Sequence, residues 1–305
     1  MDFTLTPDQA QLSGACTTLL ARRAGPERAR DVRARGGLDA ELLAALDEAG
    51  FLDLFTDPDA GPLAAALVTE WTAEAAGVAP VGLRTLVAPA VLDGEIPRAV
   101  SVVRAGSPGP VRFGAEAEVL LVLDGDEASV ARTGDWTATA VPSTYGYPLA
   151  TVEIHRSEPL ASGAGAVARR WWQVAVAAEV AGCARAAVQL TNRYLKDREQ
   201  FDRPLATFQA LQHRLADCLV RVEGTTWLAR LAADRGADPE LAASAAVAAV
   251  DTAGTVMAET HQLTGAMGFT LEYDLHLWSL RLQALRSEAG GLDGHAQALV
   301  AARWG

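Results

Sequence analysis

The spacing of apolar residues changes twice along this 305-residue chain, and that change narrows its possible folds more than any other feature. Up to about residue 95, apolar residues recur every three to four positions, as on the buried face of a helix. Between about residues 97 and 155 they gather in short β-rich runs, and from about residue 164 the helical spacing returns. Helices segregated from one β layer favour an α+β fold, mostly α, over a doubly wound sheet.

The first region is expected to form an N-terminal helical domain over residues 1–95. Thr6-Pro7-Asp8-Gln9 is a helix-start signature, because Thr can cap, Pro fits the first turn and Gln can hydrogen-bond back to the cap. Leucines and alanines keep helical spacing from residue 38 until Gly50 interrupts it. Residues 64–79 form another stretch of this kind.

Residues 96–160 are expected to form a reduced middle β domain. The β-rich runs are 100–103, 119–123, 128–131 and 151–154. Asp124-Gly125-Asp126 separates two of these runs and is typical of a hairpin turn. Trp136 is interpreted as packing between strands.

The last region, residues 161–305, is expected to form a C-terminal four-helix bundle. Four apolar-sided stretches support it, at about 178–194, 205–228, 238–263 and 273–286. No Gly-x-Gly-x-x-Gly follows a predicted strand, so no Rossmann dinucleotide site is indicated.

Charge and composition exclude several classes of partner. The net charge of −12 argues against a nucleic-acid or anionic-membrane partner, because both require a basic face. The three cysteines are widely spaced, which favours reduced core residues over a disulfide framework, and the five histidines lack metal-ligand spacing, so no metal site is expected. No basic segment with an apolar stretch behind it opens the chain, and no uninterrupted apolar run of about 18 residues occurs. We therefore expect a cytoplasmic protein.

The turn between the first two bundle helices, residues 193–214, concentrates cations and amides. Asp197-Arg198-Glu199-Gln200-Phe201 ends one helical pattern, and Pro204 suits the first turn of the next helix. An exposed guanidinium beside free N–H groups at a helix start can bind phosphate. An ordinary arginine-flanked turn between helices has the same composition, so this segment alone leaves both interpretations open.

Three segments of the C-terminal region give the chain a resemblance to the acyl-CoA dehydrogenases. They are 181–187 leading to Tyr194, Arg198-Glu199-Gln200-Phe201 with Phe208-Gln209-Ala210, and residues 262–270 with Glu272-Tyr273. Members of that family are flavoproteins with an N-terminal helical domain, a middle β domain and a C-terminal four-helix bundle. The order of the regions in this chain is similar.

The resemblance implies FAD as the cofactor and acyl-CoA as the substrate. In the family, the Arg-x-x-Phe and Gln-x-x-Gly segments contact the diphosphate and adenosine of an FAD held mainly by a neighbouring subunit. The residues at the matching positions are Arg198, Phe201, Gln209, Gln262, Gly265 and Gly268. The chemistry fits, since a guanidinium pairs with a diphosphate and glycine permits close approach of the backbone.

The catalytic base of the family has no counterpart at either of its usual positions. The family's reaction removes an α-proton with a glutamate while the β-hydride leaves to the flavin. The usual position falls on Ala289 and the alternative position on Trp172, and neither is a carboxylate. Glu288 is the candidate base if the loop shifts by one residue; otherwise it is a solvent-exposed carboxylate in a polar loop. Glu179 is interpreted as a surface or interhelical residue.

In these departures the chain resembles the short subunit of the heteromeric acyl-CoA dehydrogenases of actinobacterial steroid side-chain degradation. The middle domain is short and lacks the family's Thr-Glu loop paired with a Trp-Ser/Thr element. In those enzymes, a truncated subunit completes the FAD site of a catalytic partner in an α2β2 assembly.

Three hypotheses follow for this chain. The first is a short subunit that serves FAD-dependent α,β-dehydrogenation of an acyl-CoA thioester together with a catalytic partner. The second is a self-sufficient homo-oligomeric acyl-CoA dehydrogenase with Glu288 as base. The third is a non-catalytic scaffold that kept the fold.

Overall fold

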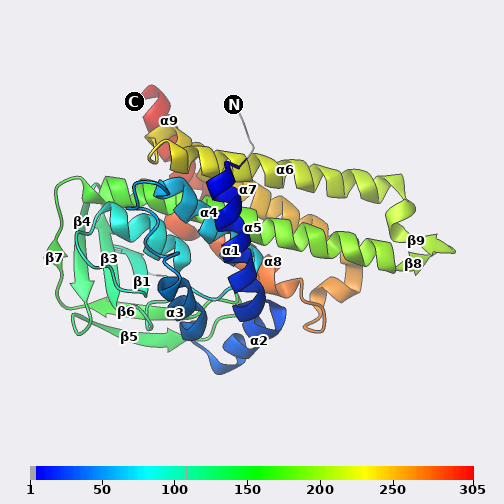
Figure 1. Cartoon of the computed structure of the whole chain (residues 1–305), viewed down its shortest axis with the longest axis horizontal. Coiled ribbons are helices and arrows are strands. Elements are labelled where there is room, and N and C mark those ends of the chain that lie inside the picture. The colour runs from blue at the N-terminus through cyan, green and yellow to red at the C-terminus, as the bar shows by residue number, and fades with distance from the viewer. Residues whose placement is uncertain (1–4, 108) are drawn as a thin grey trace.

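The computed structural model describes residues 5–107 and 109–305, and its helices dominate (Figure 1). The strands of the middle region lie at one end of the molecule, and the long helices of the C-terminal region extend away from them toward the other end (Figure 1). The expected α+β fold, mostly α, is confirmed.

Four α-helices precede the strands. They are α1 (Pro7–Arg23), α2 (Pro26–Arg35), α3 (Ala40–Glu48) and α4 (Gly61–Glu74), followed by a π-helical turn, η1 (Leu83–Val87), and a 3-10 turn, η2 (Ala88–Ala90). The capping box at Thr6 and Gln9 is confirmed, with the Gln9 N–H donating to Oγ1 of Thr6 over 3.2 Å. The predicted helix at 64–79 ends earlier, at Glu74. Ala76 takes a φ of +57°, and the Gly77 N–H bonds the Thr72 carbonyl, which closes the helix as a Schellman motif does.

The described strands of the middle region form two small sheets. One has the order β1 (Val100–Arg104), β3 (Val119–Asp124), β4 (Glu127–Arg132), β7 (Glu158–Pro159); the other has the order β2 (Val111–Arg112), β6 (Leu149–Ile154), β5 (Trp136–Val141). β1 and β3 are parallel, whereas β3 and β4 form the predicted hairpin, with Gly125 at a φ of +59° in its two-residue turn. Strand β5 was not predicted from the sequence, which indicated only that Trp136 packs between strands. The indole N–H of Trp136 donates to the Gly114 carbonyl over 3.3 Å.

The C-terminal region holds one helix more than the four expected. The α-helices are α5 (Ala164–Asp197), α6 (Gln209–Asp234), α7 (Pro239–Thr264), α8 (His276–Leu285) and α9 (Gly291–Trp304), with 3-10 turns η3 (Leu205–Thr207), η4 (Gly265–Phe269) and η5 (Glu288–Gly290). A short hairpin, β8 (Glu199–Gln200) with β9 (Arg203–Pro204), follows α5. The expectation that Pro204 lies in the first turn of a helix is wrong, because hairpin pairing holds it and α6 begins at Gln209.

Helix α5 connects the parts of the molecule. It packs against α4, α6, α7 and α8 and also touches β3 and β4. A Cβ on Gly182 would lie 2.1 Å from the Glu70 carbonyl oxygen, so α5 and α4 cross with their backbones in contact. The largest cluster of buried apolar residues runs from Ala29 to Ala289 and draws on all three predicted regions. The domain boundaries at 95 and 160 stay predictions.

Two helical stretches, Ala164–Asp197 and Pro239–Phe269, are long and apolar enough to cross a membrane by length and composition alone. Of the most apolar 18-residue window, 83% is buried in the first stretch and 50% in the second. Core helices of this kind pass the same test, so the two stretches are weak evidence for a membrane. The three cysteines are buried and free, as expected.

Candidate functional site

Both segments predicted to contact FAD lie toward the same end of the bundle, because α6 and α7 are antiparallel. Nε of Arg214, near the start of α6, lies 2.6 Å from a carboxylate oxygen of Glu259, near the end of α7. Further along α6, the hydroxyls of Thr225 and Thr252 lie 2.8 Å apart. The β8–β9 hairpin and the segment after α7 accordingly both lie remote from the sheets (Figure 1).

The first segment presents a free cation and an exposed ring. Arg198 ends α5, its own N–H bonds the Tyr194 carbonyl, and its guanidinium has no partner within the described part of the chain. Phe201 is 83% exposed at the hairpin tip, and its ring meets Phe208 edge-on at 5.9 Å between centroids. Gln209 is exposed as the first residue of α6. A guanidinium that lacks a protein partner is available to an anionic ligand.

The second segment combines an exposed amide with two glycines that the local backbone requires. Gln262 is exposed on the last turns of α7. Gly265 ends α7 with a φ of +58°, a common glycine role at a helix end, and the space around its missing side chain is open. A Cβ on Gly268 would lie 2.1 Å from Oγ1 of Thr264, so this turn has no room for a side chain. The roles of all these residues toward FAD stay predictions.

A cleft of about 920 Å³ brings together Trp172 and Ala289, the two positions at which the resemblance predicts a base. Trp172 on α5 and Ala289 on η5 line it, together with residues of β1, of the β3–β4 turn and of α9. Its charged lining includes three arginines, Arg104, Arg169 and Arg170, and the carboxylate of Asp124. The two predicted positions therefore share one cleft, and neither residue is a carboxylate.

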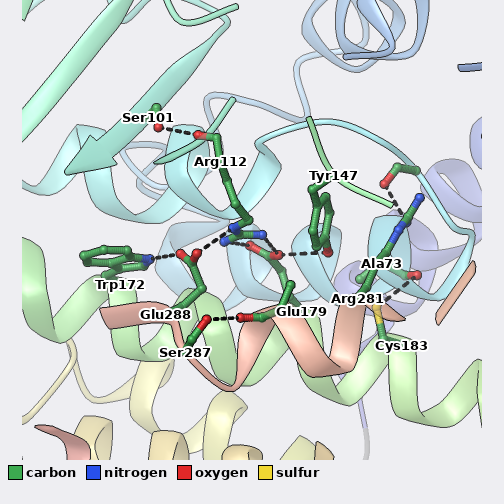
Figure 2. A network of polar contacts seen from close by, with 12 residues as sticks. Ala73, Ser101, Arg112, Tyr147, Trp172, Glu179, Cys183, Arg281, Ser287 and Glu288 are labelled. Carbon is green, nitrogen blue, oxygen red and sulfur yellow. Dashed lines mark hydrogen bonds and ion pairs between the residues drawn. The ribbon is translucent and has the colours of Figure 1, made fainter. Parts of the chain in front are cut away.

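Glu288 does not line this cleft; its side chain points toward Arg112 (Figure 2). Its side chain is only 16% exposed, and one carboxylate oxygen accepts a hydrogen bond from Nε1 of Trp172 over 3.2 Å. The other oxygen lies 3.1 Å from Nε of Arg112, as an ion pair without the alignment of a hydrogen bond. The expectation of a solvent-exposed carboxylate is wrong, because these partners hold Glu288 inside the protein. Its role as a base stays a prediction, although both of its oxygens already face protein partners.

The backbone of η5 explains why Glu288 and Ala289 diverge. Ala289, Gly290 and Gly291 all have positive φ, at +50°, +104° and +64°. Three successive residues in this unusual region break the helical path between α8 and α9. Ala289 consequently lines the cleft, while Glu288 points to Arg112.

Arg112 is the centre of a buried polar cluster that includes Glu179 and Tyr147 (Figure 2). Nη1 of Arg112 lies 2.7 Å from a carboxylate oxygen of Glu179 on α5, and the Tyr147 hydroxyl donates to the same oxygen over 3.3 Å. Burial opposes the charge on Arg112, but the carboxylates of Glu179 and Glu288 outweigh burial and raise its pKa well above the usual value. For Tyr147, burial itself is the main cause that raises the pKa well above its usual value.

Glu179 is thus an interior residue that connects α5 to β2, and the surface interpretation of it is wrong. Sequence reasoning missed Arg112 altogether. A single arginine in a strand of two residues carries no periodic signal, and its partner Glu179 is 67 positions away. Among the described residues no group of three or more His, Cys, Asp or Glu side chains could hold a metal ion.

Known proteins match part of the sequence and share the fold of this chain. Residues 171–303 match the family described as "Acyl-CoA dehydrogenase, C-terminal domain". The solved butyryl-CoA dehydrogenase of Megasphaera elsdenii superposes with a TM-score of 0.80 at 20% identity, over 99% of both chains. Residues 171–303 thus match the C-terminal domain of the acyl-CoA dehydrogenases, and the chain as a whole shares the fold of a solved acyl-CoA dehydrogenase.

Two curated relatives match the chain over part of its length, and one solved complex shares its fold. The acyl-CoA dehydrogenase IpdE2 of Mycobacterium tuberculosis is 37% identical over 133 residues, which cover 44% of this chain and 41% of IpdE2. FadE34 of the same organism is 38% identical over 122 residues, or 17% of its own length. The chain thus matches less than half the length of these curated relatives. The ChsE4–ChsE5 complex of M. tuberculosis shares the fold with a TM-score of 0.83 at 22% identity, over 100% of both chains.

Proposed function

We propose that this chain is a subunit of an FAD-dependent acyl-CoA dehydrogenase that completes the FAD site of a second, catalytic subunit. The observation that carries the proposal is the division of the molecule into two unlike ends. At one end, an unpaired Arg198 and an exposed Gln262 remain available to a ligand from outside the chain. At the other, the cleft lined by Trp172 and Ala289 lacks a base at both of the family's positions.

The residues at the bundle end suit a dinucleotide. The guanidinium of Arg198 would pair with the diphosphate, and the amide of Gln262 would hydrogen-bond its polar groups. The open space at Gly265 would admit ligand atoms close to the backbone. When bound, FAD supplies the acceptor for the β-hydride of an acyl-CoA thioester. A carboxylate of the partner subunit would remove the α-proton, because Glu288 faces Arg112 instead of the cleft.

Two solved neighbours support a heteromeric assembly, and the name of the second also supports a steroid-derived substrate. One is the ChsE4–ChsE5 complex, and the other is named as the Tcur3481–Tcur3483 steroid ACAD, which shares the fold with a TM-score of 0.81 at 23% identity. We extend both features to this chain as part of the proposal. A cytoplasmic α2β2 tetramer acting on a steroid-derived acyl-CoA is its most specific form.

Co-expression tests the proposal. The chain should purify colourless by itself and should yield a yellow complex with flavin absorbance and turnover when it is produced with an acyl-CoA dehydrogenase encoded beside it. A yellow, active protein from this chain alone would instead establish the homo-oligomeric enzyme. A stable complex without flavin or turnover would establish the scaffold.

A further inference from the structure

The absence of a base at the two predicted positions does not explain the orientation of the Glu288 side chain. A carboxylate stands one residue from the usual position, yet it points into the Arg112 cluster and not into the cleft. Both of its oxygens meet a protein group within 3.2 Å: Trp172 for one and Arg112 for the other. The orientation of Glu288 is therefore fixed by two side chains from other elements.

Arg112 is held rigidly enough to impose this orientation. Its side chain is only 3% exposed, and its carbonyl accepts a hydrogen bond from the Ser101 hydroxyl of β1 over 2.5 Å. Glu179 binds two of its nitrogens, and its guanidinium lies 4.8 Å from the centroid of the Tyr147 ring (Figure 2). A buried guanidinium with these anchors cannot follow Glu288 if that side chain turns away.

The charges of the cluster favour the same arrangement. Arg112 and Arg281 are buried cations, and Glu179 and Glu288 are the carboxylates near them (Figure 2). Arg281 bonds the carbonyls of Ala76 and Gly77 and has no carboxylate partner among the described residues. Turning Glu288 into the cleft would leave two buried cations with Glu179 alone, and buried charge without a partner is costly.

We infer that Arg112 is a positioning residue that acts through Glu288: it holds this carboxylate out of the cleft and thereby keeps the chain from serving as the proton-abstracting subunit. The functional meaning rests on the proposed function, in which the partner supplies the base. The test needs neither FAD nor a partner, so its failure is separate from a failure of that proposal.

The experiment is carbodiimide labelling of carboxylates in the full-length chain, read out by peptide mass spectrometry. Glu288 should react slowly in the wild type, while Asp124, exposed in the cleft lining, should react fast. The double variant Arg112→Met/Glu179→Leu removes a buried cation and a buried anion together, so that no charge is added to the interior. In this variant Glu288 should react about tenfold faster, since it has lost a charged partner.

Two controls separate release of Glu288 from unfolding and from loss of packing. Glu70 is 2% exposed and is paired with Arg185 and Arg230, which are not part of the Arg112 cluster, so it should stay protected in every variant. Arg112→Lys keeps a cation at the centre and should keep Glu288 protected. Wild-type Glu288 reacting as fast as Asp124 would overturn the inference. So would unchanged protection in the double variant, or loss of protection in Arg112→Lys, with Glu70 protected.

Discussion

Arg198 is exposed and its guanidinium has no partner among the described residues, so substitution can test its predicted contact with FAD. Replacing it with alanine removes no protein contact of its guanidinium, so the stability of the chain should hardly change. Retention of FAD by the complex should weaken by roughly 1.5–3 kcal/mol, about ten- to more than a hundredfold, as for a charge-assisted contact. Equilibrium dialysis of the flavin measures this. Arg22→Ala, an exposed arginine on α1, is the matched control, and equal flavin affinity in both variants would remove Arg198 from the site.

Glu288 separates the two catalytic hypotheses. With the base in the partner subunit, Glu288→Gln should leave the turnover of the complex nearly unchanged, because the amide can still accept from Trp172. If Glu288 were the base, the rate of the chemical step should fall by about 10²–10⁴-fold. Single-turnover measurement of flavin reduction distinguishes these outcomes.

Asp202 carries local backbone strain at the tip of the β8–β9 hairpin. Phe201 and Asp202 both have positive φ, at +58° and +60°, as in a two-residue turn that favours glycine at its second position. Asp202→Gly should raise the free energy of unfolding by about 0.5–1 kcal/mol, part of the roughly 1–2 kcal/mol that a left-handed conformation costs. Urea denaturation measures it. Glu199→Gly in the adjoining strand should have the opposite sign, and a loss of stability in Asp202→Gly would contradict the argument.

The packing of helix α4 against helix α5 depends on one glycine. Because a Cβ on Gly182 would lie 2.1 Å from a backbone oxygen of α4, Gly182→Ala must push the helices apart. We expect the free energy of unfolding to fall by about 1–3 kcal/mol, as for overpacking of a core. Gly224→Ala on α6 is the matched control. Nothing lies within 4 Å of its added Cβ, so it should stabilise the helix by roughly 0.5–1 kcal/mol. Equal effects of the two substitutions in thermal denaturation would count against the crossing.

The elements that the sequence predicts are those with a strong local pattern. The cap at Thr6, the helix stopped by Gly50, the hairpin at Gly125 and the long bundle helices all follow from neighbouring residues. α9 escaped prediction because Gly291 and Gly294 lower helical propensity, and its formation depends on packing against α7. β5 alternates small Thr and Ala residues and leaves its middle exposed, so its pattern is weak.

The candidate site divides in the same way. Arg198 and Gln262 belong to contiguous motifs and can be recognised without a structure. The contacts among Arg112, Glu179 and Glu288 join β2, α5 and η5, and only tertiary folding brings these elements together. Long-range ion pairs of this kind leave no trace in local spacing.

Acid should destabilise the whole fold, because the folded protein disfavours protonation of His295. Burial is the main cause that lowers its pKa to about 4, with nearby Arg104 adding and a backbone hydrogen bond to Glu288 opposing. The unfolded chain then binds more protons between pH 6.5 and about 4, so the free energy of unfolding should fall as pH falls through this window. His295→Gln should flatten this dependence in urea denaturation, whereas His213→Gln, at an exposed position, should leave it intact. An unchanged slope in His295→Gln would contradict the assignment.

The Arg112 cluster also constrains how such a chain can evolve. Removing Arg112 alone would strand the carboxylates of Glu179 and Glu288, whereas a glutamate at position 289 would face the cleft that Ala289 lines. Releasing Glu288 by a single substitution of Arg112 therefore passes through a protein with unpaired buried carboxylates. Under the proposed function, the two ion pairs of Arg112 would make the division of roles between this chain and a catalytic partner hard to reverse by single substitutions.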